Sequence, residues 1–212
     1  MHTDLSFLDR EHLTTTPTHS IKEALRMWIA ERKPRCLKHP HGFYVMLLKR
    51  SVDEQWRLHL WPNGHREITG VPARIHLHDT HVSSRILTGA LTNIQYTSTP
   101  VTSDCPSGKP VYEVIYDGNR YAQKTANTLR KSEVREAVSE TDRLNLEVGD
   151  FYCIERYTLH EALVPTDVAT CTLVCMHEHA DGIVKLMGVD GYPDEISFLR
   201  TDHDGSVFLE YL

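Results

Sequence analysis

A series of short runs of β-branched and aromatic residues, separated by turn residues, constrains the fold of this chain more than any other feature. The runs lie at 43–48, 56–61, 73–78, 84–96, 111–116, 120–124, 142–146, 152–154 and 170–176. Asp117-Gly118, between two of them, is a hairpin signal. Residues 97–110, rich in Ser, Thr, Pro and Gly, are expected to form a loop. Successive short strands predict an all-β sandwich or barrel and not alternating βαβ units.

The N-terminal residues follow a helical pattern instead. Ser20 and Glu23 have the spacing of a capping box, and Pro34 is expected to end the helix. Between these signals, apolar residues recur on one helical face at Ile21, Ala24, Leu25, Trp28 and Ile29. This helix is expected to pack on the outside of the β-structure or in a dimer contact.

We expect three parts: an N-terminal helical extension at 1–41, a barrel at 42–180 and a C-terminal tail at 181–212 that packs on the barrel. With 40% hydrophobic and 25% charged residues, the chain can form a sizeable core. The formal net charge of −6 argues against nucleic acid or an anionic membrane as a partner. No apolar run approaches the roughly 20 residues of a membrane span. The first residues lack the pattern of a secretory signal, so a cytoplasmic location is expected.

Histidine is the residue type that points to chemistry. The five cysteines lack C-x-x-C spacing and predict neither a disulfide framework nor a cysteine zinc site. The 14 histidines include three H-x-H pairs, at His39/His41, His76/His78 and His177/His179. On a strand, such a pair places two imidazoles on one face about 6.5–7 Å apart, where both can bind one ion. We interpret the first pair as loop residues, the last as a solvated strand end, and the middle pair as the metal candidate.

Two segments carry a resemblance to a known family. Residues 70–93 contain the middle histidine pair, a short gap, a strand, a turn glycine and another strand. Residues 149–160 begin with Gly-Asp, continue as a strand and end with a histidine. They resemble the two metal motifs of the cupin superfamily, which lie on separate strands of one jelly roll. The resemblance covers roughly residues 42–178. It implies an all-β, cupin-like jelly-roll β-barrel with a metal bound by His76, His78 and His160.

The resemblance also suggests what the metal does. The glutamate usual in the first motif has no counterpart at Val82-Ser83-Ser84, which leaves three neutral histidines and the full dipositive charge on the ion. Its open positions then suit an anionic substrate, water or dioxygen. Such a site resembles that of thiol dioxygenases of the cysteine dioxygenase type, which implies ferrous iron and an arginine, Arg50 or Arg57, that holds a substrate carboxylate. The Ser-x-His-x-Tyr triad of that family is absent from 171–177.

Three side chains complete the expected catalytic set. Arg57 is a candidate for the carboxylate contact, and Arg74 shares the strand parity of His76 and His78, so it is expected to point inward. Tyr157 is a candidate cavity wall or proton donor. His81 is expected at the rim of the site.

The sequence therefore predicts a metal-dependent cupin enzyme, most specifically a non-haem Fe(II) dioxygenase that acts with dioxygen on a small polar or amino-acid-like molecule, such as a thiol. Two alternatives stay open. Imidazole ligands suit several divalent ions, so a zinc, manganese or nickel isomerase or lyase fits the same residues. A non-enzymatic barrel that binds a small ligand is the other alternative. Cupin barrels often pair through their sheets, so the resemblance also implies a homodimer.

Overall fold

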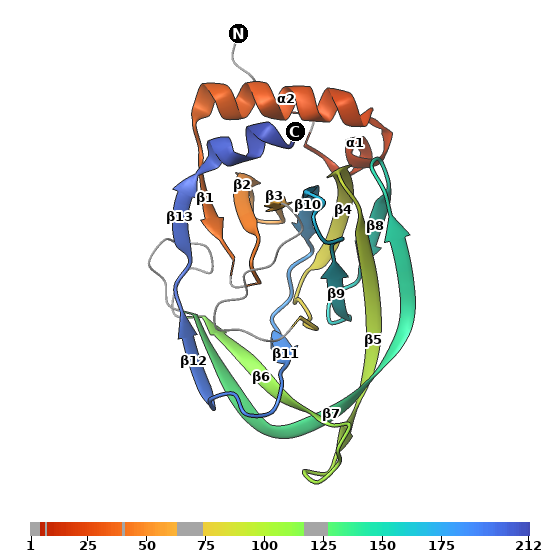
Figure 1. Cartoon of the computed structure of the whole chain (residues 1–212). Helices are drawn as coiled ribbons and strands as arrows, with labels where there is room; N and C mark the ends of the chain where they lie inside the picture. The colour runs from red at the N-terminus through yellow and green to blue at the C-terminus, as the bar shows by residue number, and fades with distance from the viewer. Residues whose placement is uncertain (1–4, 7, 40, 63–73, 117–126) are drawn as a thin grey trace.

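A computed structural model describes residues 5–6, 8–39, 41–62, 74–116 and 127–212 of the chain. Two antiparallel β-sheets face each other, and the N-terminal helices lie at one end (Figure 1). The predicted Asp117-Gly118 hairpin and the predicted strand at 120–124 lie outside the described residues. None of the helices in the described part of the chain has the length and apolar character that a membrane span requires.

The first sheet has seven strands. They are β1 (Arg35–Lys38), β2 (Tyr44–Arg50), β3 (Glu54–Trp61), β4 (His81–Thr88), β8 (Phe151–Ile154), β10 (Thr170–His177) and β13 (Thr201–Asp204). Their order across the sheet is β13-β1-β2-β3-β10-β4-β8. Strands from both ends of the chain therefore lie next to each other at one edge, where β1 pairs with β13.

The second sheet has six strands. They are β5 (Leu91–Val101), β6 (Lys109–Tyr116), β7 (Asn127–Leu146), β9 (Leu159–Leu163), β11 (Lys185–Met187) and β12 (Glu195–Phe198). Five follow the order β11-β6-β7-β5-β9, and β12 pairs with β7. The segment that carries His76 lies between the two ends of this order, because it hydrogen-bonds to β9 on one side and to β11 on the other. This segment therefore joins the two edges of the second sheet.

The strand pairing is that of a jelly roll. Eight segments run from β3 to β10 when the inserted strand β6 is not counted. The first pairs with the last, the second with the second last, and so on inward: β3 with β10, the His76 segment with β9, β4 with β8, and β5 with β7. This nested pairing folds the chain into two facing sheets. It confirms the predicted all-β, cupin-like jelly-roll barrel with an N-terminal helical segment.

Side-chain alternation on β3 separates an apolar core from a polar interior. Trp56, Leu58 and Leu60 are fully buried in the largest apolar cluster, together with residues of the N-terminal helices. Arg57, His59 and Trp61 point to the opposite face and line a cavity. Because side chains alternate along a strand, one strand supplies both the apolar contact with the helices and the polar wall of the cavity.

The N-terminal helices are α1 (Arg10–Thr15) and α2 (Thr18–Arg32). The apolar face of α2 packs as predicted, with Ile21, Leu25 and Ile29 buried beside the C-terminal 3-10 helix η2 (Gly205–Glu210). The predicted capping box is wrong, because Pro17 occupies the N-cap and Ser20 lies inside the first turn.

Several predicted boundaries differ from the structure. The predicted loop at 97–110 shrinks, since β5 continues to Val101 and β6 begins at Lys109. Strand β7 extends over 20 residues, although only 142–146 showed a strand pattern. Most of its side chains are half-buried or exposed, so it lacks the apolar alternation that reveals a strand, and pairing with β5 and β6 maintains it. The segments expected as an extension and a tail supply β1 and β11 to β13 to the two sheets.

Gly89, between β4 and β5, offers a test of this packing. It has a φ of +75°, and an added Cβ would lie 2.2 Å from the carbonyl oxygen of Ala169. Gly89→Ala is expected to lower the free energy of unfolding by about 2–4 kcal/mol in urea denaturation, because backbone strain and a backbone clash add. Gly191 has a similar φ of +85° with nothing within 4 Å, so Gly191→Ala should lose only about 1–2 kcal/mol. Equal losses in the two variants would contradict this account.

Candidate metal centre

A cavity of about 150 Å³ lies between the two sheets. Its apolar wall includes Phe43, Trp61, Tyr152 and Met176. Six histidines also line it, at positions 39, 41, 59, 76, 78 and 160. Three arginines complete the polar wall, at positions 57, 74 and 200. Among the described residues that line this cavity there is no aspartate, glutamate or lysine.

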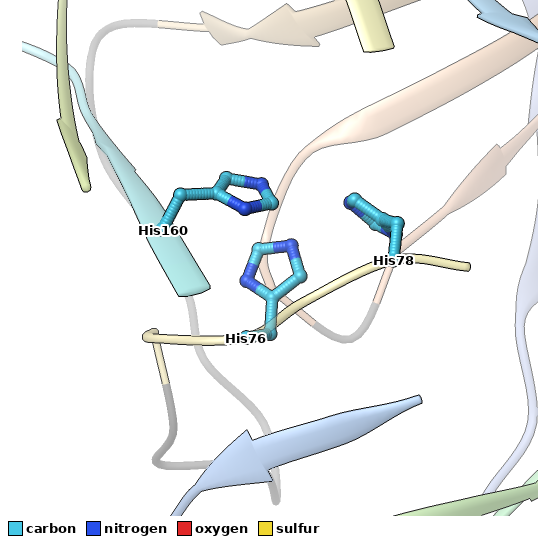
Figure 2. A group of neighbouring side chains, drawn as sticks. All are labelled: His76, His78 and His160. Carbon is cyan, nitrogen blue, oxygen red and sulfur yellow. The ribbon is translucent and has the colours of Figure 1, made fainter. Parts of the chain in front are cut away.

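Three of these histidines converge on one point. His76, His78 and His160 each offer a nitrogen atom, and these atoms all lie within 4.8 Å of one another. The ring of His76 lies 4.8 Å from that of His78 and 4.5 Å from that of His160, measured between centroids. Figure 2 shows the three rings directed toward a common centre. Two nitrogens on one tetrahedral zinc ion lie about 3.4 Å apart, so small ring rotations would bring all three into bonding range.

Backbone hydrogen bonds bring the ligand segments together. The N–H of His76 donates to the carbonyl oxygen of His160 at 3.0 Å, and the N–H of His160 donates to that of His76 at 2.9 Å. The N–H of Tyr157 donates to the carbonyl oxygen of His78 at 2.7 Å. The sequence predicted that His76 and His78 lie in a regular strand. The structure places them instead in a segment that is joined to its neighbours by isolated bridges.

Hydrogen bonds also set the orientation of two imidazoles. Nδ1 of His76 lies 2.8 Å from the carbonyl oxygen of Arg74, and Nδ1 of His160 lies 3.0 Å from that of Thr158. Since a carbonyl oxygen only accepts, Nδ1 carries the hydrogen in both rings, and the lone pair is on Nε2. Metal-binding histidines are commonly oriented by a hydrogen bond of this kind.

The environment keeps two of the three imidazoles neutral. Burial, followed by the charge of His76, lowers the pKa of His160 to about 3. Burial, followed by the charges of His76 and His160, lowers the pKa of His78 well below its usual value. Neutral imidazole is the form that binds a metal, so this donor set fits a divalent ion.

The structure brings most of the predicted site residues to one place. Arg57, which is only 6% exposed, and Arg74 line the cavity with the three histidines. Tyr157 does not line it: this residue has a φ of +63° in the turn between β8 and β9, and its hydroxyl donates to the carbonyl oxygen of Asp181. Tyr152, on β8, forms part of the aromatic wall instead.

Sequence reasoning missed four polar side chains of the cavity. His39 and His41 lie in the connection between β1 and β2, as expected, but both line the cavity, and the ring of His41 lies 4.9 Å from that of His76. His59 could have been found, because it shares a face of β3 with Arg57. Arg200 had no such signal, since it follows a short strand in the expected tail.

The remaining predicted histidines lie away from the cavity. His177 was interpreted as part of a solvated strand end, but it is buried, and its Nε2 lies 3.0 Å from Oγ of Ser83. The ring of His81 stacks on that of His177 at 5.5 Å. His179 is exposed and pairs with Asp79. This cluster belongs to the contact between the barrel and α1, since Nη1 of Arg10, on α1, lies 3.2 Å from Nδ1 of His177.

Comparisons with known proteins add little to this picture. No protein-family model matches the chain, and no curated protein matches it. The chain is similar to the solved structure of KdgF from Halomonas sp., with a TM-score of 0.34 and 12% sequence identity, over 66% of this chain and 83% of that chain. A likeness this weak carries no argument about activity. The chain's own jelly-roll pairing and three-histidine cluster are compatible with a metal-binding cupin.

Removal of one ligand tests the metal site directly. The full chain, loaded with zinc and dialysed, is expected to retain about one zinc ion. His160→Ala should weaken zinc binding at least about 100-fold, because one of the three histidine ligands is lost. Metal analysis and competition with a chelator measure both quantities. His19→Ala is the matched control, because His19 is exposed on α2. Unchanged zinc affinity in folded His160→Ala protein would reject the site.

Proposed function

We propose that this chain is a metal-dependent cupin enzyme, most specifically a non-haem iron(II) dioxygenase that acts on a small polar or amino-acid-like molecule, such as a thiol. The convergence of three imidazoles in one cavity supports the proposal. The more familiar iron site has two histidines and one carboxylate. Here no carboxylate lies among the described residues that line the cavity, so a bound ion would keep its full dipositive charge.

An ion of this kind suits the proposed chemistry. Iron(II) at the three histidines would supply the one-electron chemistry that a reaction between dioxygen and an organic molecule requires. Three protein ligands leave coordination positions open for substrate and dioxygen. The partners of the chain are accordingly a small molecule and dioxygen.

Side chains of the cavity would bind and orient the substrate. Arg57 and Arg74 each present a planar guanidinium, which binds a carboxylate through two parallel hydrogen bonds. The side chain of Arg57 contacts Oε1 of Gln55, which limits its motion. Phe43, Trp61 and Tyr152, which line the cavity, would shield the ligand from water. Tyr157 takes no part in this arrangement because its side chain lies outside the cavity.

The same donor set favours a second candidate. Imidazole nitrogens suit zinc, manganese and nickel as well as iron, and affinity order does not choose among these ions. A cupin isomerase or lyase that contains one of them is the alternative enzyme, and a barrel that only binds a small ligand is the non-enzymatic one. The homodimer and the cytoplasmic location stay predictions.

Oxygen consumption separates these candidates. Protein purified anaerobically and loaded with iron(II) is expected to contain about one ion per chain and to consume dioxygen when a panel of thiols and amino acids is added. His76→Ala should lose both the iron and the oxygen consumption, and His19→Ala should keep both. If turnover continues under argon with zinc, manganese or nickel, the dioxygenase proposal is rejected in favour of an isomerase or lyase. If the chain binds a small ligand but contains no metal, the non-enzymatic binding protein is the alternative that stands.

A further inference from the structure

A second group of chemically active side chains lies on the outer face of the first sheet. Cys153 on β8 is opposite Ser83 on β4, and β4 pairs on its other side with β10, which ends at His177. Val82, on β4, and Tyr152, on β8, line the cavity. Because side chains alternate along a strand, Ser83 and Cys153 point away from the cavity. This group is therefore separate from the three-histidine cluster.

Hydrogen bonds connect these side chains in series. Sγ of Cys153 lies 3.5 Å from Oγ of Ser83, and Oγ of Ser83 lies 3.0 Å from Nε2 of His177. Nδ1 of His177 lies 3.2 Å from Oε1 of Glu178. A carboxylate only accepts, so in this contact Nδ1 carries the hydrogen and Nε2 accepts from the hydroxyl of Ser83. The series has the arrangement of an activated nucleophile, in which a base serves the nucleophile and a third group orients the base.

Charged and titratable groups from α1, β3 and β4 surround His177. Nη1 of Arg10, on α1, lies 3.2 Å from Nδ1 of His177 and 3.2 Å from Oε1 of Glu178. The ring of His81, on β4, stacks on that of His177 at 5.5 Å. Glu54, on β3, is opposite His177 and pairs with Nε of Arg10. Burial, followed by the charge of Arg10, lowers the pKa of His177, so its imidazole is neutral at pH 7 and accepts a proton.

Cys153 combines this neighbourhood with access from solvent. Its side chain is exposed, and β8 is the last strand of the first sheet. Ser83 and His177 are only 5% and 8% exposed, so the base is shielded from solvent while the cysteine is not. Three other cysteines are buried, at positions 36, 171 and 175, and burial raises the pKa of their thiols to about 11, about 12 and about 12. Reaction with a soluble reagent requires both a thiolate and access, and these three cysteines lack both.

We propose that Cys153 is a site of thiol–disulfide exchange with small disulfides, and that His177 accepts the thiol proton through Ser83. The site uses neither the metal nor the cavity, so it goes beyond the proposed function and does not depend on it.

The exchange balances in atoms and electrons. The thiol hydrogen of Cys153 moves to Oγ of Ser83 as the hydroxyl hydrogen of Ser83 moves to Nε2 of His177. The thiolate attacks one sulfur of the small disulfide, whose S–S bond breaks while a new S–S bond forms at Cys153. The released thiolate takes up the proton from His177. Cys153 is thereby oxidised to a mixed disulfide, and the released half of the small disulfide is reduced to a thiol.

Exchange rates at single cysteines test this proposal. The full chain is treated at pH 7 with bis(hydroxyethyl) disulfide, which is small and uncharged, and mass spectrometry of peptides follows the mixed disulfide at each cysteine. Ser83→Ala and His177→Gln are each expected to slow exchange at Cys153 at least about tenfold, because the thiol loses its route to the base. Absence of exchange at Cys153 in the wild type, or an unchanged rate in both folded variants, would overturn the proposal. If His177→Gln does not fold, Ser83→Ala, which removes a single oxygen, carries the test alone.

Cys105 provides a control within the same protein. It is half-buried in the connection between β5 and β6, and its Sγ lies 3.3 Å from Oγ of Ser107. Its exchange rate is expected to be the same in the wild type, Ser83→Ala and His177→Gln. His19→Gln is the matched histidine variant, because His19 is exposed on α2, and it should leave the rates at both cysteines unchanged. An equal decrease at both cysteines in the Ser83 and His177 variants would reject the relay.

The pH profile separates a proton relay from a structural role. A thiol without a base reacts as its thiolate, so its exchange rate falls about tenfold for each pH unit below its pKa. With His177 as the acceptor, the rate at Cys153 is expected to stay nearly level between about pH 6.5 and 7.5, where the imidazole is neutral. In His177→Gln the rate at Cys153 should fall about tenfold over that interval. The same slope at Cys153 in both proteins would overturn the role of His177.

Discussion

The reciprocal backbone hydrogen bonds between His76 and His160 are the interaction on which the site depends. They form the second of the four nested strand pairs of the jelly roll. The same segment continues to β11, where the N–H of Leu77 donates to Lys185, so it joins both edges of the second sheet. The contact between His76 and His160 thus places two candidate metal ligands from distant parts of the chain side by side, and the contact with β11 completes the second sheet. The three-histidine cluster and the closure of the second sheet therefore depend on the same short segment.

The two faces of β3, in the first sheet, have different roles, and this allows the barrel interior to be polar. Trp56, Leu58 and Leu60 face the N-terminal helices and are fully buried. Each such side chain contributes about 1.5–3 kcal/mol to stability when it leaves water. This cluster stabilises the fold outside the cavity, so the opposite face of β3 is free to present Arg57 and His59. Arg85, on β4, connects the layers by donating to the carbonyl oxygens of Leu13 and Thr16 in the helical segment.

Predictions from the sequence succeeded where the local pattern repeats. Strands β3 and β10 have strong apolar content, and their positions were predicted within two residues. The face of α2 that contains Leu25 was also predicted. Strand β7 was mostly missed, because neighbouring strands and not an apolar face stabilise it. Tyr157 was a candidate cavity wall or proton donor, but a left-handed turn directs its ring toward Gly182, where the absence of a side chain leaves room.

The sequence by itself determined which residues share a face of the chain. Spacing of two residues placed His76 with His78 and Arg57 with His59, because side chains alternate along any extended backbone. Only the tertiary structure decided which face turned toward the cavity and which distant segments met there. It added His41 and Arg200 to the wall and left Tyr157 outside. The physical reason is that alternation is a property of the local backbone, whereas the cavity is formed by strand pairs between segments far apart in the sequence.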